Sequence, residues 1–196
     1  MPDAPAGSLP HSFAVAACDL KRLIDKTRFA ISNEETRYYL NGIYLHAAKS
    51  KDAVTLRAVA TDGHRLAQVD LKLPKGADGM PGVIVPRKTV GEVQRLIEDT
   101  EAEMTIELSQ AKIRFTIGNV VLTSKLIDGT FPDYGRVIPQ GNDKELVVDK
   151  KDFEAAVDRV STISSERGRA VKLALSAGKL ILSVTNPDSG SATEEL

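Results

Sequence analysis

The stretch ATDGHRLAQV, residues 60–69, brings a carboxylate, an imidazole and a guanidinium together within four positions. Asp62, His64 and Arg65 carry the functional groups needed for acid–base chemistry on a phosphate. The same stretch lies between two alternating apolar runs, where Asp62-Gly63 is a strong signal for a tight hairpin turn. Two interpretations therefore stay open: a phosphodiester-processing enzyme that uses Asp62 and His64, or a hairpin connection in which His64 is a turn residue.

Other signals of catalysis or metal binding are missing from the sequence. It contains no GxxxxGK[ST] phosphate loop, no GxGxxG and no GxSxG elbow. The histidines His11, His46 and His64 lie far apart, and none has a His or Cys at metal-ligand spacing. Cys18 precedes an amphipathic helix, where a small buried apolar residue is expected. We therefore expect no enzymatic activity, no catalytic residue, no metal site and no cofactor.

The composition predicts a folded cytoplasmic protein. Of the 196 residues 42% are hydrophobic and 27% are charged, which is enough for a packed core. No apolar run approaches the roughly 20 residues that span a bilayer, the first residues lack a secretory signal, and a single cysteine suits a reducing compartment. The net charge is -1, so any charge that holds nucleic acid must be confined to one face.

The elements that would position these residues recur along the chain. VAACDLKRLI, VPRKTVGEVQRLI and VVDKKDFEAAVDRV share a register that starts at Val15, Val85 and Val148, with apolar residues five and eight positions later. This pattern predicts a short strand, a polar turn and an amphipathic helix. Alternating segments joined by tight connections follow each helix, and they predict three antiparallel strands.

Two of the predicted helices also carry start signals. Thr89 with Glu92 three residues later has the pattern of a capping box, and Asp149 is a candidate N-cap for the third helix.

Because a lone helix beside three strands buries little surface, two units should pair into one domain with the helices on one side. The third unit lacks such a partner, so the sequence is expected to be part of a longer chain. The predicted segments are a linker at 1–11, a complete domain at 12–136, a connector at 137–143 and a half domain at 144–196.

Basic side chains avoid the predicted core positions in all three helices. They are Lys21, Arg22, Lys26, Arg28, Arg87, Lys88, Arg95, Lys150, Lys151 and Arg159. They form either ordinary solvated helix faces or, if the helices share one side, a surface that attracts phosphate without reading base sequence. The loop SNEETRYYLNG adds Arg37, Tyr38 and Tyr39, which could offer one charge and stacking rings to nucleic acid. Alternatively, one of the two tyrosines packs under the sheet.

Five motifs in this order resemble the family of the bacterial sliding clamp, the beta subunit of DNA polymerase III. They are RYYLNGIYLH, VATDGHRLA, VIVPRK, TSKLIDGTFPDY and RVIP, and the resemblance extends over essentially the whole chain. It implies an α+β DNA clamp fold in which each subunit has three domains, each built from two copies of the repeated unit. Residues 12–136 would be the middle domain, and 144–196 the first half of the third.

The resemblance also implies a function in DNA replication. Clamps of this family are processivity factors: two subunits form a head-to-tail homodimer, a ring around double-stranded DNA that is bound independently of sequence. The ring tethers DNA polymerase III and other replication and repair proteins, and a clamp loader places it on DNA. Helices line the hole of the ring, the sheets lie outside, and neither a membrane nor a cofactor is involved.

Site residues follow from the resemblance by motif. The family's peptide-binding cleft, an apolar floor with a polar rim, maps to Leu40, Thr61, Gly63, His64, Arg65, Leu66, Pro132, Arg136 and Val137. Its DNA-contacting loop maps to Arg37, Tyr38 and Tyr39, although Glu34 and Glu35 just before it disfavour contact with phosphate. Together with two helix residues, the predicted DNA-binding residues are Arg22, Arg37, Tyr38, Tyr39 and Lys88. A Leu40→Asp substitution is expected to abolish peptide binding and to leave the fold largely intact.

Overall fold

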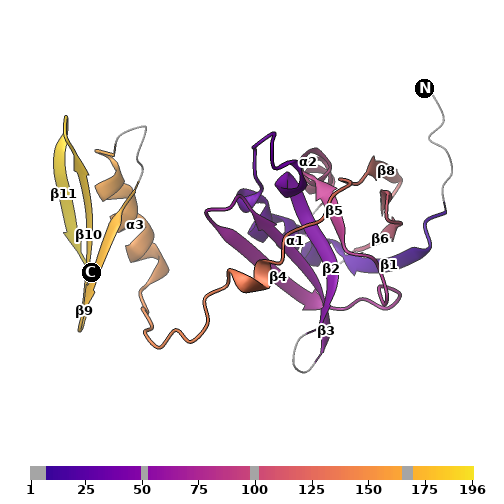
Figure 1. Cartoon of the computed structure of the whole chain (residues 1–196), viewed down its shortest axis with the longest axis horizontal. Coiled ribbons are helices and arrows are strands. Elements are labelled where there is room, and N and C mark those ends of the chain that lie inside the picture. The colour runs from indigo at the N-terminus through magenta and orange to yellow at the C-terminus, as the bar shows by residue number, and fades with distance from the viewer. Residues whose placement is uncertain (1–7, 50–52, 98–101, 165–169) are drawn as a thin grey trace. The chain divides into compact units, whose positions relative to one another are not determined.

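The chain forms two compact units in the computed structural model, Met1–Tyr134 and Gly135–Leu196 (Figure 1). The structure describes residues 8–49, 53–97, 102–164 and 170–196. Each unit combines helices with antiparallel sheet, which confirms the predicted α+β class. Within the described ranges, no helix is long and apolar enough to cross a membrane.

The predicted order of strand, helix and three antiparallel strands occurs twice in the first unit. The first repeat comprises β1 (His11–Ala16), α1 (Ala17–Thr27), β2 (Gly42–Lys49), β3 (Val54–Thr61) and β4 (Leu66–Lys72). The second comprises β5 (Val83–Pro86), α2 (Arg87–Leu96), β6 (Glu103–Leu108), β7 (Lys112–Ile117) and β8 (Val120–Lys125). Short 3-10 helices are η1 (Arg28–Ala30), η2 (Tyr38–Leu40) and η3 (Tyr134–Arg136).

The two repeats of the first unit exchange their opening strands. One sheet has the order β1-β6-β7-β8, and the other has the order β4-β3-β2-β5. β1 of the first repeat therefore pairs with β6 of the second, and β5 of the second pairs with β2 of the first. Because edge N–H and C=O groups need partners, each repeat completes the backbone hydrogen bonding of the other.

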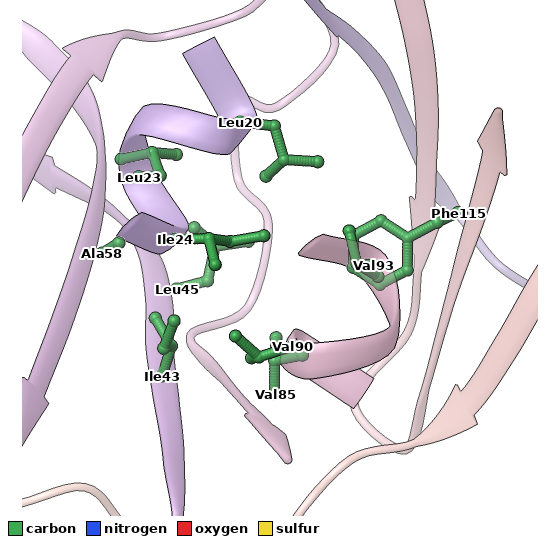
Figure 2. A pocket seen from close by; sticks show the side chains of 10 residues that line it. All are labelled: Leu20, Leu23, Ile24, Ile43, Leu45, Ala58, Val85, Val90, Val93 and Phe115. Carbon is green, nitrogen blue, oxygen red and sulfur yellow. The ribbon is translucent and has the colours of Figure 1, made fainter. Parts of the chain in front are cut away.

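Both helices of the first unit pack on the β4-β3-β2-β5 sheet. α1 lies against β3 and β4, α2 lies against β2 and β5, and the two helices contact each other. The apolar positions that define the helix register are buried, with Leu23 at 2% and Val93 at 0% exposure. A small cavity of about 30 Å³ remains where the helices meet, and Figure 2 shows the apolar side chains that line it. These residues are Leu20, Leu23, Ile24, Ile43, Leu45, Ala58, Val85, Val90, Val93 and Phe115.

The second unit contains α3 (Lys150–Ser161), β9 (Lys172–Ser176), β10 (Lys179–Asn186) and β11 (Gly190–Glu195). The sheet order is β11-β10-β9, and α3 packs on β10 and β11. Ala156 and Val160 of the helix bury themselves against Leu180, Leu182 and Val184 of β10. The strand expected before the third helix is not formed, since residues 141–149 have no regular structure. In the first unit that strand pairs with another repeat, and the second unit contains only one.

One helix start agrees with the sequence and another does not. The Asp149 carboxylate accepts hydrogen bonds from the backbone amides of Lys151 and Asp152 at 2.8 and 3.1 Å, which confirms the predicted N-cap. The capping box at Thr89 is wrong, because α2 begins two residues earlier, at Arg87. Thr89 is buried instead, and its hydroxyl lies 2.6 Å from the hydroxyl of Ser124.

Candidate functional site

The connection between β3 and β4 is a four-residue loop rather than the two-residue turn that Asp-Gly predicts. Thr61 pairs directly with Leu66, so residues 62–65 form the loop. The Asp62 carboxylate accepts hydrogen bonds from the backbone amides of His64 and Arg65 at 2.9 and 3.0 Å, and from the Arg65 Nε at 3.1 Å. The Thr61 hydroxyl donates to the Arg65 carbonyl at 2.8 Å. His64 and Arg65 are therefore part of a loop that Asp62 and Thr61 hold in shape.

The electrostatics of Asp62 do not support acid–base chemistry. Burial acts to raise the pKa of Asp62, but the amide hydrogen bonds from Arg65 and His64 and the Arg65 guanidinium outweigh it and hold that pKa below its ordinary value. A carboxylate that is stabilised in its charged form is a weak proton acceptor at neutral pH. In the part of the chain that the structure describes, no group of His, Cys, Asp and Glu residues could hold a metal ion.

An apolar cluster lies beside this loop, on the face of the β4-β3-β2-β5 sheet opposite the helices. Alternation along β3 places Ala58 and Ala60 in the helix-covered core and Val59 on the other face. The buried members of this outer cluster are Leu40, Val59, Ile84 and Phe131. The partly buried residues packed against them are Tyr39, Tyr44, Leu66, Ile127 and Tyr134.

Stacked aromatic rings attach the segment after β8 to this face. The Phe131 ring stacks on Tyr44 at 4.8 Å between centroids, and Tyr44 stacks on His46 at 4.3 Å. The Tyr134 hydroxyl lies 3.0 Å from the Nε2 of His46 and accepts a hydrogen bond from Arg57 at 3.3 Å. Burial, and then the nearby Arg57 charge, lowers the pKa of His46 to about 4, so the ring is neutral at pH 7.

The predicted cleft residues fall into three groups. Leu40 and Leu66 lie in the outer cluster, which also contains Phe131, the neighbour of Pro132. Four residues, Thr61, Gly63, His64 and Arg65, lie at the loop and its base. Two residues, Arg136 and Val137, are exposed side chains of the second unit.

The burial of Leu40 changes one expectation. Its side chain is 3% exposed and packs among other buried residues. A carboxylate there would be desolvated without a partner, which costs folding free energy. This does not fit the expectation that Leu40→Asp leaves the fold largely intact. Leu66, in contrast, is only partly buried, so part of its side chain is accessible from solvent.

The predicted DNA loop is tied to the β3–β4 loop. Arg37 Nε donates to Glu34 at 2.8 Å, and its Nη2 donates to the carbonyl of Asp62 at 3.0 Å. The hydrogen bond from Arg37 also lowers the pKa of Glu34. Arg37 is thus engaged within the protein, and Glu34 is its ion-pair partner. Of the two tyrosines, Tyr39 packs on the outer cluster, whereas Tyr38 is 52% exposed.

The helices place charged side chains in solvent. Arg22 and Lys88 are exposed, and so is Arg87 at the start of α2. Other basic residues are paired: Lys21 Nζ lies 2.6 Å from Asp25, and Arg95 Nη1 lies 3.1 Å from Glu92. The accessible positive charge is therefore smaller than the number of lysines and arginines on the helices suggests.

Some residues at the site were missed by the sequence analysis. Phe29 is 55% exposed, and the guanidinium of Arg65 lies 5.6 Å from the centre of its ring. Both line an open depression together with Arg28 and Arg87. An apolar residue just beyond the end of the first helix was the sequence signal that could have identified Phe29. The aromatic contacts of Phe131 and Tyr134 were also missed, although both lie in the quoted motif TSKLIDGTFPDY.

Comparison with known proteins covers both units. Residues 14–133 match the DNA polymerase III beta subunit, central domain, and residues 135–196 match its C-terminal domain. The beta sliding clamp of Caulobacter vibrioides is 52% identical over 204 residues, which cover 100% of this chain and 55% of that protein. The beta sliding clamp of Pseudomonas putida is 44% identical and is covered over 47% of its length. The chain thus spans about half the length of these relatives.

Solved structures give the same result. The DNA polymerase III subunit beta of Bartonella birtlesii, bound to griselimycin, superposes with a TM-score of 0.95 at 60% identity, covering 100% of this chain and 53% of that one. The DNA polymerase III subunit beta of Pseudomonas aeruginosa superposes with a TM-score of 0.91 at 42% identity, with 100% and 53% covered.

Proposed function

Because this chain belongs to the family of the DNA polymerase III beta subunit, the bacterial sliding clamp, we propose that it is part of a processivity factor for DNA replication. The observation that carries this proposal is the match to two successive clamp domains, over residues 14–133 and 135–196. The protein would act in the cytoplasm as a non-catalytic head-to-tail homodimer that a clamp loader places around duplex DNA. Residues 12–136 would form the middle clamp domain, 137–143 a connector and 144–196 half of the third.

We propose that the β3–β4 loop and the outer cluster form the binding site for partner peptides, including one from DNA polymerase III. Internal hydrogen bonds of Asp62 and Thr61 fix the loop, so little ordering entropy is lost on binding. His64 and Arg65 project from it as a polar rim, and the partly buried Leu66 supplies apolar surface beside them. The exposed Pro132 would extend this surface, and the family motif alone adds Arg136 and Val137 to the proposed site residues.

We further propose that DNA is attracted by the helices and by the 34–39 loop. Arg22 and Lys88 are exposed, and Tyr38 offers an exposed ring for stacking. Arg37 would act mainly by fixing that loop through Glu34 and the Asp62 carbonyl. Contacts of this kind act on phosphates and sugars and carry no sequence information.

Calorimetric titration tests the peptide site. The full 196-residue chain is titrated with a clamp-binding peptide, such as the C-terminal motif of a polymerase, and then with the same peptide lacking its apolar side chains. We expect binding only of the first peptide, and weaker binding after Leu66→Ala or Arg65→Ala. Arg95→Ala, which removes an exposed arginine on α2, is the matched control. Equal binding by the Leu66→Ala variant and the parent would overturn the site assignment.

A further inference from the structure

An open depression on the first unit exposes an aromatic ring among arginine side chains. Its volume is about 490 Å³, within the range of pockets that hold small ligands, and we call it the Phe29 depression. Its lining comes from α1 and the segment after it, from the β3–β4 loop and from α2. The residues are Asp25, Arg28, Phe29, Ile31, Asn33, Arg65, Arg87 and Gln94. Of these, only Arg65 belongs to the proposed peptide site.

The fold does not account for the exposure of Phe29. Its side chain is 55% exposed, whereas the next two residues, Ala30 and Ile31, are 0 and 4% exposed and anchor this segment in the core. The Arg65 guanidinium lies 5.6 Å from the centre of the Phe29 ring. Asp62 holds that guanidinium in place, with its carboxylate 3.1 Å from the Arg65 Nε. The ring is thus presented at the surface beside a fixed positive charge.

Two further guanidinium groups lie along one face of α2. Arg28 Nη1 donates a hydrogen bond to the Gln94 amide oxygen, and Arg28 Nη2 lies 3.8 Å from the position that a Cβ on Gly91 would take. Arg87, Gly91 and Gln94 follow one another at helical spacing, so they share a face of α2. Among the described residues, neither Arg28 nor Arg87 forms an ion pair. Both charges are therefore available to an anion.

The carboxylate of Asp25, which also lines the depression, is already paired. Its Oδ2 lies 2.6 Å from Lys21 Nζ, and its Oδ1 accepts a hydrogen bond from Gln94 Nε2 at 2.5 Å. Burial acts to raise the pKa of Asp25, but the hydrogen bonds from Lys21 and Gln94 outweigh it and hold that pKa below its ordinary value. Pro86 provides no side-chain cap for α2, so the positive pole of this helix adds to the attraction of anions.

We propose that the Phe29 depression binds a nucleotide whose base is unpaired, either within a single strand of nucleic acid or as a free nucleotide. The base stacks on the exposed part of the Phe29 ring, and the phosphate binds to Arg28 and Arg87. This site goes beyond the proposed attraction of duplex DNA by Arg22 and Lys88, and either proposal can fail without the other.

Other ligands use only part of these groups. Duplex DNA cannot stack on Phe29, because its bases are paired and stacked inside the double helix. An acidic peptide would use the arginines but not the ring. An apolar peptide would find Phe29 as the exposed apolar side chain of the lining, because Ile31 is buried. An unpaired nucleotide uses both the ring and the charges.

A tryptophan substitution tests the stacking. The chain contains no tryptophan, so Phe29→Trp places a single indole in the depression. We expect oligo-dT or dTMP to quench its emission, and the one that does so at the lower concentration identifies the source of the nucleotide. An abasic strand with the same phosphates should not quench it. Val121→Trp is the matched control, because Val121 is 60% exposed on β8 and Phe29 is 55% exposed.

Three results of the fluorescence titration would overturn the proposal. They are emission that neither oligo-dT nor dTMP quenches, equal quenching by the abasic strand, and equal quenching of the Phe29→Trp and Val121→Trp variants. The first would show that no base stacks at this position. The other two would show that quenching does not depend on a base stacked in the depression.

Calorimetric titration of the 196-residue chain with the stronger quencher measures the contribution of each group. A Tyr38→Ala background removes the other exposed ring that is proposed to stack. Phe29→Leu, which keeps an apolar side chain without a ring, should weaken binding about fivefold or more. Arg87→Gln should weaken binding and reduce its salt dependence. Arg95→Gln, on the same helix but outside the depression, is the matched control.

The same titration can contradict the proposal in three ways. Unchanged affinity in Phe29→Leu would show that the ring takes no part. Equal losses in Arg87→Gln and Arg95→Gln would show that any helix arginine serves. Displacement of the nucleotide by poly-glutamate at equal concentration would show that the depression is a site for acidic peptides instead.

Discussion

Gly63 and Arg37 touch across two loops, and their contact limits what can stand at position 63. Gly63 has a φ of 89°, and a Cβ there would collide with the Arg37 guanidinium. We expect Gly63→Ala to lower the free energy of unfolding by about 1–2 kcal/mol, measured by urea denaturation. Gly118→Ala is the control, since Gly118 has a φ of 57° with nothing within 4 Å of the added Cβ. Equal losses for both variants would show that the contact with Arg37 is energetically neutral.

His46 should make stability depend on pH. Burial lowers its pKa from 6.5 to about 4, so the unfolded chain binds more protons between these values. The stability that neutral His46 contributes is complete above about pH 6.5 and is lost as the pH falls toward 4. We expect the urea midpoint to fall more between pH 7.5 and 5 in the parent than in His46→Gln. An unchanged pH dependence of the urea midpoint in His46→Gln would contradict the assignment.

Single side chains were predictable where a local pattern determines them. Asp149 is an N-cap because its carboxylate meets amides two and three residues ahead, which is a purely local geometry. Thr89 has the same local signal but is drawn into a contact with Ser124 from another strand. Arg37 is likewise a residue type that often contacts phosphate. Its guanidinium instead donates a hydrogen bond to the carbonyl of Asp62, in a loop 25 residues away. Such distant partners are not readable from spacing.

At the scale of elements, periodicity predicted the helices and most strands of the first unit but not how they pair. Apolar residues that recur every 3.6 or 2 positions show which face of a helix or strand is buried. The strand that pairs with a sheet edge is determined instead by packing between segments far apart in the sequence. The exchange of β1 and β5 between repeats was therefore not foreseen. It also explains the one missing element, because the segment at Val148 has the pattern of β5 without a second repeat in its unit to receive it.

The cavity between α1 and α2 gives a prediction for these elements. Val90 lines this apolar space of about 30 Å³, which can take roughly one methyl group. We expect Val90→Ile to raise the free energy of unfolding by up to about 1 kcal/mol. Val59→Ile is the matched control, since Val59 is 0% exposed in the outer cluster and an added methyl there should strain the packing. Thermal denaturation of both variants checks this, and destabilisation by Val90→Ile would show that the cavity is not available.

At the scale of the whole molecule, the charge balance limits how tightly DNA is held. The net charge is -1, and several helix lysines and arginines are already paired. We expect the 196-residue chain to bind duplex DNA with roughly micromolar or weaker affinity, steeply weakened by salt. Fluorescence anisotropy should show that Arg22→Glu with Lys88→Glu weakens binding equally on unrelated sequences. A sequence preference that survives high salt would contradict this.

The exchange of opening strands also has a consequence for the order of synthesis. β1 leaves the ribosome early, yet its partner β6 begins about ninety residues later, with Ala16 paired to Glu103. At ordinary elongation rates β1 therefore waits for roughly 5–20 s as an unpaired apolar strand. β2, β3 and β4 pair with near neighbours and can fold during this interval. The nascent chain should then pass through a stage in which the first repeat is a helix on three strands with a free β2 edge. This stage would resemble the packing of α3 on the β11-β10-β9 sheet.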